Sequence, residues 1–240
     1  MAQELEQNDR KRRQMLSDIS HELRTPLTVI RGEIEALQDG IRQAGPEALQ
    51  SLHAEVLRLN QLVEDLHQLM LADAGELPCH MASTRLGAAI LPVLKRYRGR
   101  AAAAGLALEW QLPTPDLQVK ADPGRIGQVL VNLLENSVRY TDQGGAVRVA
   151  LSRVGSDAVL TVDDSAPGVP DGANRLLFER LYRVDAARQR ADCAAHGGGG
   201  SGLGLAICKA LVVAHGGTIE ALASRLGGLQ VRITLQLDSK

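Results

Sequence analysis

The stretch SHELRTPL, residues 20–27, decides how the first part of this chain folds. His21 and Thr25 are four residues apart, so on an α-helix they share one face, and Glu22 lies beside them. Apolar residues recur around this stretch at spacings of three and four, which predicts a long helix with one apolar stripe. The stripe consists of Leu16, Ile19, Leu23, Leu27, Ile30, Ile34, Leu37 and Ile41. His21 is opposite this stripe, in water, where a phosphate acceptor should lie.

A histidine on a helix surface is usually only a solvated side chain, so His21 alone does not identify a function. Pro26 adds a second feature beside it. Because proline has no N–H, the carbonyl of Glu22 loses its helical partner, and we expect Pro26 to interrupt and loosen the helix next to His21. A kink there could reposition the histidine, although a merely tolerated kink is the alternative.

A second helix follows a turn that Gly40 and Gly45-Pro46 mark. Its apolar positions alternate at steps of three and four: Leu49, Leu52, Val56, Leu59, Val63, Leu66 and Met70. Two helices with so long an apolar seam make only half a core, so we expect two hairpins to close a four-helix bundle as a homodimer. The alternative is a monomeric hairpin packed on the rest of the chain. The hairpin domain is expected over residues 1–77.

Residues 78–240 show a mixed pattern instead. Strands are predicted at residues 106–112, 147–151, 159–162 and 230–235, where apolar residues alternate or run together. Helices are expected to start near Asp122-Pro123 and near Gly202, the last one ending at His215-Gly216. This order predicts an α/β sandwich with the helices on one face of the sheet.

Composition narrows the class of protein. A formal net charge of −1 from 27 basic and 28 acidic residues gives no footprint for nucleic acid, so DNA binding is not expected. The three cysteines have no metal-ligand spacing, which argues against a zinc site or a disulfide framework and fits a reducing compartment. No apolar run reaches the ~18 residues of a membrane span.

Three motifs stand in the second domain: NLLENSVRYT at 132–141, DSAPG at 164–168 and GSGLGL at 200–205. Together with residues 20–27, and in this order, they resemble the H box, N box and two glycine boxes of sensor histidine kinases of two-component systems. RGEIEALQDG at 31–40 and DSAPG are most similar to the Bae-type envelope-stress sensors. The resemblance implies the Bergerat ATP-binding fold shared with gyrase, Hsp90 and MutL. It also implies a cytoplasmic fragment without membrane contact of its own, from a parent chain anchored upstream in the bacterial inner membrane.

The N box suggests a magnesium site. Asn132 and Asn136 lie one helical turn apart and offer neutral carbonyl oxygens, which suit Mg²⁺ whose other partners are waters and phosphates. We expect Asn136 to be the direct ligand and Asn132 the outer one, Arg139 to contact the phosphates and Tyr140 to pack on the nucleotide. Relatives that hydrolyse ATP usually have a glutamate at the position of Asn132, and without it the general base for water is missing. Two asparagines at this spacing can also be plain helix-surface groups.

Asp164 follows a strand and can accept a hydrogen bond from the adenine amino group, although a turn-opening aspartate is a common alternative. Gly168 closes the same motif and is expected at the nucleotide. Family members most often have a glycine where this chain has Ala166, and alanine tolerates a positive φ poorly, so either this turn uses an ordinary backbone or the loop is altered.

Residues 171–200, with Arg180 as a nucleotide contact, are expected to form a lid over the triphosphate. The second glycine box, Gly200, Ser201, Gly202, Leu203, Gly204 and Leu205, passes straight into an apolar helix. Backbone N–H groups at a helix N-terminus face phosphate oxygens readily. A plain glycine linker is the alternative for residues 197–200.

The leading hypothesis is an ATP-dependent protein histidine kinase, in which His21 attacks the γ-phosphate and Glu22 takes the imidazole proton. The resemblance implies transfer of the phosphoryl group to an aspartate of a response regulator, and a role of Thr25 in dephosphorylating that regulator. The alternatives are an ATPase of the Bergerat fold and a non-catalytic dimerisation scaffold.

Overall fold

The computed structural model describes residues 2–43, 45–165, 167–170, 172–182, 184 and 201–238, without the side chains of residues 2–16 and 18. The chain divides into two compact units, Met1–His67 and Gln68–Lys240. Within the described residues, no helix combines the length and the apolar character needed to cross a membrane.

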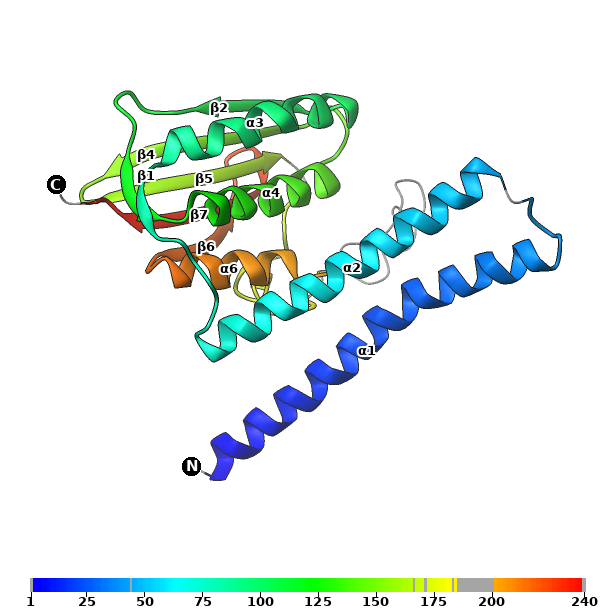
Figure 1. Ribbon diagram of the computed structural model, residues 1–240. Coiled ribbons are helices and arrows are strands. Elements are labelled where there is room, and N and C mark those ends of the chain that lie inside the picture. The colour runs from blue at the N-terminus through cyan, green and yellow to red at the C-terminus, as the bar shows by residue number, and fades with distance from the viewer. Residues whose placement is uncertain are drawn as a thin grey trace. The chain divides into compact units, whose positions relative to one another are not determined.

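The first unit is built from an antiparallel pair of helices, α1 (Ala2–Gln38) and α2 (Pro46–Ala74), and α2 continues into the second unit (Figure 1). The predicted helical hairpin is confirmed, and the turn uses Gly40 at a φ of +69°. The expected interruption at Pro26 is wrong, because α1 runs through this residue unbroken. Only one backbone hydrogen bond is lost at a proline, and here the neighbouring turns remain helical on both sides.

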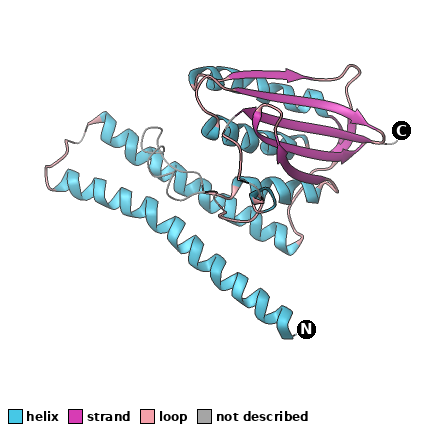
Figure 2. Ribbon diagram, turned by 180° about the vertical axis from the view of Figure 1, so that it is seen from behind, coloured by secondary structure: helices cyan, strands magenta, loops and turns pink. Residues whose placement is uncertain are grey.

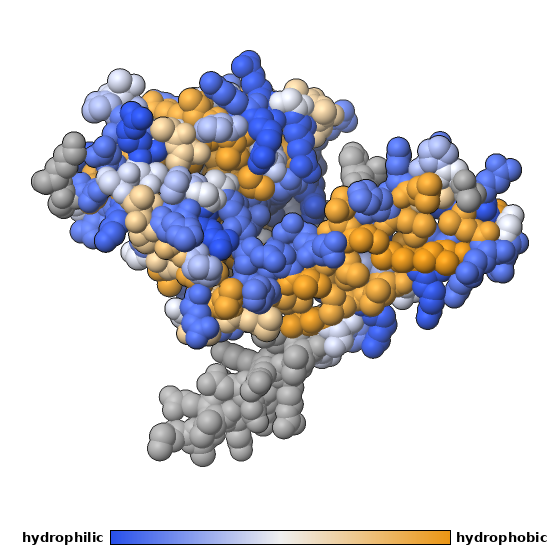
Figure 3. All heavy atoms as spheres, in the orientation of Figure 1, coloured by the Kyte–Doolittle hydropathy of each residue, from blue (hydrophilic) through white to orange (hydrophobic). Residues whose placement is uncertain are grey.

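The apolar stripe of α1 is only partly covered within one chain. Ile19, Leu23, Ile30 and Leu37 are half-buried, whereas Leu27 is 52% exposed. Further exposed apolar side chains lie along both helices of the hairpin, Val29, Ile34, Leu49, Val56, Leu57 and Val63, and Ile41 is exposed in the turn between them. Figure 3 shows apolar side chains gathered along these helices. One hairpin therefore leaves much of its apolar surface in contact with water.

The second unit contains a five-stranded mixed sheet and a small two-stranded one. The large sheet has the order β2 (Ala107–Gln111), β4 (Ala146–Val154), β5 (Asp157–Ser165), β7 (Gly227–Gln236), β6 (Thr218–Ala223). β2 pairs parallel with β4, and the other neighbours pair antiparallel. β1 (Ala82–Arg85) and β3 (Gln118–Ala121) form the small antiparallel sheet.

Three helices cover one face of the large sheet: α3 (Leu86–Ala103), α4 (Pro123–Tyr140) and α6 (Gly204–Ala214) (Figures 1 and 2). Strand residues that face them alternate in sequence and are buried, as Val147, Val149 and Leu151 of β4 show. The predicted α/β sandwich is thereby confirmed. The sequence reading did not include α3, β1, β3 or β6.

The opposite face of the sheet is polar and paired across strands. Glu109 of β2 pairs with Arg148 of β4 at 3.4 Å, and Arg232 of β7 pairs with Glu220 of β6 at 3.1 Å. Between these pairs, Gln230 donates to Asp163 at 2.7 Å. An antiparallel sheet with one face on a core and one face in water shows this alternation.

Candidate functional site

Asp164 is the buried polar residue on which the candidate site is built. It stands near the end of β5 on the core side, 6% exposed, where the alternation of the strand would otherwise place an apolar side chain. One carboxylate oxygen, Oδ1, accepts a hydrogen bond from the backbone N–H of Leu229 at 2.6 Å, and Oδ2 accepts one from the hydroxyl of Ser137 at 3.1 Å. Burial raises the pKa of Asp164 to about 6, although both hydrogen bonds favour the charged form.

A close approach of two strands puts Leu229 within reach of Asp164. The pairing of β5 with β7 shifts register between Asp163 and Ser165, opposite Gly227–Leu229. A Cβ on Gly228 would lie 2.4 Å from both Asp164 Oδ1 and the carbonyl of Ser165, so only glycine fits there. Gly168, expected at the nucleotide, lies beside the same segment, since its Cβ would be 3.1 Å from the carbonyl of Gly227.

Sequence reasoning missed three members of this group, namely Ser137, Gly228 and Leu229. The adjacent glycines at 227 and 228, directly before a strand, were the signal that could have marked the close approach. Leu229 contributes its backbone N–H, and the residue type at this position does not predict such a contact.

The helix α4 brings the predicted N box next to Asp164. It begins where predicted, with Asp122 Oδ1 accepting from the backbone N–H groups of Gly124 and Arg125 at 2.8 and 3.1 Å, and with Pro123 at the first helical position. Asn132 and Asn136 are half-buried on this helix. Asn132 Nδ2 donates to the carbonyl of Gly204 at 3.3 Å, which joins the N box to the start of α6.

The amide oxygens of this helix fit a magnesium ion. Because Asn132 bonds to Gly204 through its side-chain nitrogen, its side-chain oxygen remains available, and the side chain of Asn136 has no hydrogen-bond partner among the described residues. Neutral oxygens with room for waters and phosphates suit Mg²⁺. Groups of three or more His, Cys, Asp or Glu side chains that could hold a metal do not occur in the described ranges.

Arg139 and Tyr140 end α4, and both side chains are exposed, Tyr140 by 38%. Neither side chain makes a hydrogen bond or ion pair with the described residues, so the polar groups of both are available to a ligand. The exposed tyrosine ring is typical of a residue that packs on a partner outside the chain.

The second glycine box lies against Leu181, within the segment expected to be a lid. Gly202 has a φ of +69°, and a Cβ there would be 3.0 Å from Leu181 Cα. The N–H of Leu181, itself at a φ of +58°, donates to the carbonyl of Gly202 at 3.0 Å. Ser201 Oγ accepts weakly from the N–H of Leu203 at 3.4 Å, and the Leu203 side chain is fully buried.

The helix α6 begins at Gly204, two residues later than predicted, with Leu205 half-buried in its first turn. It ends at Ala214, with His215 as the capping residue and Gly216 at a φ of +71°, at the place that the sequence predicts. Arg180, half-buried, forms an ion pair with Asp73 in the last turn of α2. Gly200, Ala166 and most of residues 183–200 lie outside the described residues.

The predicted phosphoacceptor residues lie together on α1. His21 is exposed and Glu22 half-buried. Thr25 is exposed as well, and its hydroxyl donates to the carbonyl of His21 at 3.2 Å. The hydroxyl to which the resemblance assigns a role in dephosphorylation is thus turned back to the helix in this structure.

Comparison with known proteins gives the family. Residues 11–75 match the His Kinase A (phospho-acceptor) domain, and residues 121–239 match the histidine kinase-, DNA gyrase B- and HSP90-like ATPase. Together these two models cover most of the chain. The protein belongs to the sensor histidine kinases, which confirms the resemblance noted from the motifs.

Within that family the chain is similar to the signal transduction histidine-protein kinase BaeS of Escherichia coli K12, with 46% identity over 242 residues. The match includes 99% of this chain and 50% of that protein, so the chain spans half the length of this relative. This supports a sensor of the Bae type.

Solved structures that are similar to this chain are also histidine kinases. Acinetobacter baumannii histidine kinase AdeS has a TM-score of 0.74 and 28% identity, covering 91% of this chain and 98% of its own. Full-length ShkA in complex with AMPPNP has a TM-score of 0.66 and 25% identity, covering 95% of this chain and 46% of its own.

Proposed function

We propose that the chain binds ATP with Mg²⁺ in its second unit and uses it to phosphorylate His21. The observation that carries the proposal is the convergence on Asp164: α4, β5 and β7 surround one buried carboxylate, and the N box on α4 touches the glycine box of α6. ATP is also the nucleotide type that the ShkA structure contains as the analogue AMPPNP.

Asp164 recognises the adenine base by a hydrogen bond. Each carboxylate oxygen can accept about two hydrogen bonds, and Leu229 and Ser137 use one on each. The carboxylate therefore still has room for the adenine amino group, a donor that guanine does not present at this position.

The triphosphate lies between α4 and the start of α6. Asn136 would hold a magnesium ion directly and Asn132 would be the outer ligand, and the bound ion would supply charge neutralisation on the phosphates. Arg139 and Arg180 supply cations, Tyr140 packs on the nucleotide, and the backbone N–H groups from Ser201 to Leu205 face phosphate oxygens.

Phosphoryl transfer then takes place on α1. An imidazole nitrogen of His21 forms the new N–P bond as the P–O bond to the leaving ADP breaks, and Glu22 takes the imidazole proton. The amide of Asn132 cannot act as a base for water, so hydrolysis is disfavoured and the phosphoryl group is kept for His21.

The partners follow from the helical hairpin. Its exposed apolar side chains are covered in a homodimer, in which two hairpins close a four-helix bundle.

The phosphorylated hairpin, expected over residues 1–77 and followed by the ATP-binding domain at 78–240, passes its phosphoryl group to an aspartate of a response regulator. Thr25 serves in a separate reaction, the dephosphorylation of that regulator, in which a water held by the Thr25 hydroxyl attacks the phosphoaspartate, the aspartyl P–O bond breaks and inorganic phosphate leaves. We propose that this fragment works in the cytoplasm, attached to a membrane anchor of its parent chain.

Incubation with γ-labelled ATP and Mg²⁺ tests the kinase activity. We expect label on the protein that is acid-labile and base-stable, as a phosphoramidate is, and its loss in His21→Gln with ATP binding unchanged. His53→Gln is the matched control, because His53 is also an exposed helical histidine of the hairpin. Release of free phosphate without labelled protein would instead identify an ATPase, and neither product a scaffold.

A further inference from the structure

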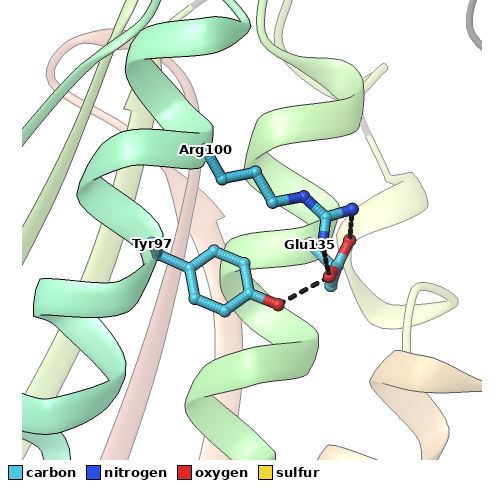
Figure 4. Close-up of polar contacts among 3 residues, drawn as sticks. All are labelled: Tyr97, Arg100 and Glu135. Atoms are coloured by element: carbon cyan, nitrogen blue, oxygen red, sulfur yellow. Dashed lines mark hydrogen bonds and ion pairs between the residues drawn. The ribbon is translucent and has the colours of Figure 1, made fainter.

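The carboxylate of Glu135 is held from the neighbouring helix α3 by two side chains (Figure 4). Arg100 donates through Nη1 to Oε1 at 2.5 Å and through Nη2 to Oε2 at 2.8 Å, a bidentate arrangement. The hydroxyl of Tyr97 donates to Oε1 at 2.5 Å. Tyr97 is 4% exposed, and burial together with the bond to Glu135 raises its pKa, so the phenol stays a donor.

Glu135 also stands four residues before Arg139 on α4. Glutamate followed by arginine at this spacing is the favourable order for an ion pair along a helix. The Arg139 side chain nevertheless has no ion pair or hydrogen bond with any residue in the described ranges, because both carboxylate oxygens of Glu135 are bonded to side chains of α3.

We infer that Tyr97 and Arg100 withhold Glu135 from Arg139 and thereby leave the Arg139 guanidinium free for nucleotide phosphate. The two α3 residues are positioning residues, since they act through Glu135 and touch no ligand. The inference rests on the proposed function, in which Arg139 contacts the phosphates.

Two effects of losing Arg100 work in the same direction. Glu135 would retain only the bond from Tyr97 and could turn to Arg139, which would then have to break that pair to bind phosphate. The charge of Glu135 would also lose its partner cation and repel the phosphates. Both effects need the negative charge at 135, and neither needs the packing of α3 on α4.

The test is to measure ATP affinity with Mg²⁺ on the full chain, and to ask whether removing the charge of Glu135 restores the affinity that Arg100→Ala loses. We expect Arg100→Ala to weaken binding about two- to fivefold, the scale of exposed ion pairs. The double variant Arg100→Ala/Glu135→Gln should return to the wild-type affinity, because an amide neither pairs with Arg139 nor repels phosphate. Raising the salt concentration should shrink the defect of Arg100→Ala.

Arg96→Ala is the matched control. The Arg96 guanidinium lies 5.6 Å from the centre of the Tyr97 ring, almost as Arg100 does at 5.7 Å, but no hydrogen bond links it to Glu135 in the described structure. Its removal should leave the affinity unchanged.

A double variant that binds no better than Arg100→Ala would overturn the inference and leave only a helix-to-helix clamp. Unchanged affinity in Arg100→Ala or in Arg139→Ala would overturn it too, while wild-type labelling of His21 would keep the proposed function. Absence of ATP binding by the wild type would reject both.

Discussion

Changing Asp164 to asparagine should make the ATP-binding unit more stable while it binds ATP more weakly. The wild-type protein holds a buried carboxylate whose pKa is raised from 3.8 to about 6 by desolvation. At about 1.4 kcal/mol for each pKa unit, this shift lowers the free energy of unfolding by up to about 3 kcal/mol at neutral pH. An asparagine keeps both hydrogen bonds, with its oxygen towards Leu229 N–H and its nitrogen towards Ser137 Oγ, and carries no charge.

The sign of the pH dependence follows from the raised pKa. Between about pH 4 and pH 6 the folded state binds more protons than the unfolded state, so the wild type loses stability as the pH rises through this range. Above about pH 6 the penalty is complete. The advantage of Asp164→Asn should therefore be close to zero at pH 4 and reach its plateau above pH 6.

Thermal unfolding of the ligand-free protein from pH 4 to pH 8, followed by circular dichroism, measures this difference. At about 2–4 °C per kcal/mol for a unit of this size, the plateau corresponds to a gain of up to about 12 °C. Asp163→Asn is the control, since Asp163 lies on the polar face of the sheet and accepts from Gln230 and Ser224. A lower melting temperature of Asp164→Asn at pH 7.5, or a gain that is the same at pH 4, would refute the reasoning.

Three further changes test other parts of the site. Asn136→Ala should lose magnesium-dependent ATP binding, and calorimetry with unchanged affinity would reject Asn136 as the ligand. Thr25→Ala should keep autophosphorylation but slow dephosphorylation of the phosphorylated regulator about tenfold or more, measured with ADP present; equal decay rates would leave the bond to the His21 carbonyl as the only role of this hydroxyl. Gly228→Ala should lower the stability by about 1–3 kcal/mol, because its Cβ would meet atoms of Asp164 and Ser165 at 2.4 Å; Gly99→Ala, with open space around it in α3, should cause no such loss in the same melting experiment.

The sequence predicts best the elements that carry their own boundaries. The periodicity of the hairpin and the Asp122-Pro123 start of α4 are local signals, and the structure has both. The helix α3 was missed, since Pro92 stands in its interior and arginines crowd its end, features that normally argue against a continuing helix. The strand β6 reads TIEALA, in which two alanines blur the alternation of a strand.

The residues of the candidate site also fall into those that a local sequence motif predicts and those that only the tertiary structure brings in. Asp164 and the asparagines could be named from their motifs, because the residue types themselves carry the chemistry. The partners of Asp164 could not, since Ser137 and Leu229 reach it from 27 and 65 residues away through the packing of α4 and the register shift of β7. The bonds of Glu135 to α3 are likewise tertiary, and its position before Arg139 alone would have suggested the wrong pair.

The paired polar face of the large sheet restricts how this protein can change over evolutionary time. Glu109 and Arg148 face each other on β2 and β4, as do Glu220 and Arg232 on β6 and β7. A single replacement at one of these positions leaves a charge opposite a neighbour that no longer balances it. We expect substitutions at 109 and 148, and at 220 and 232, to occur together among descendants of this sequence. Covariation between these positions would then identify which residues of neighbouring strands are paired.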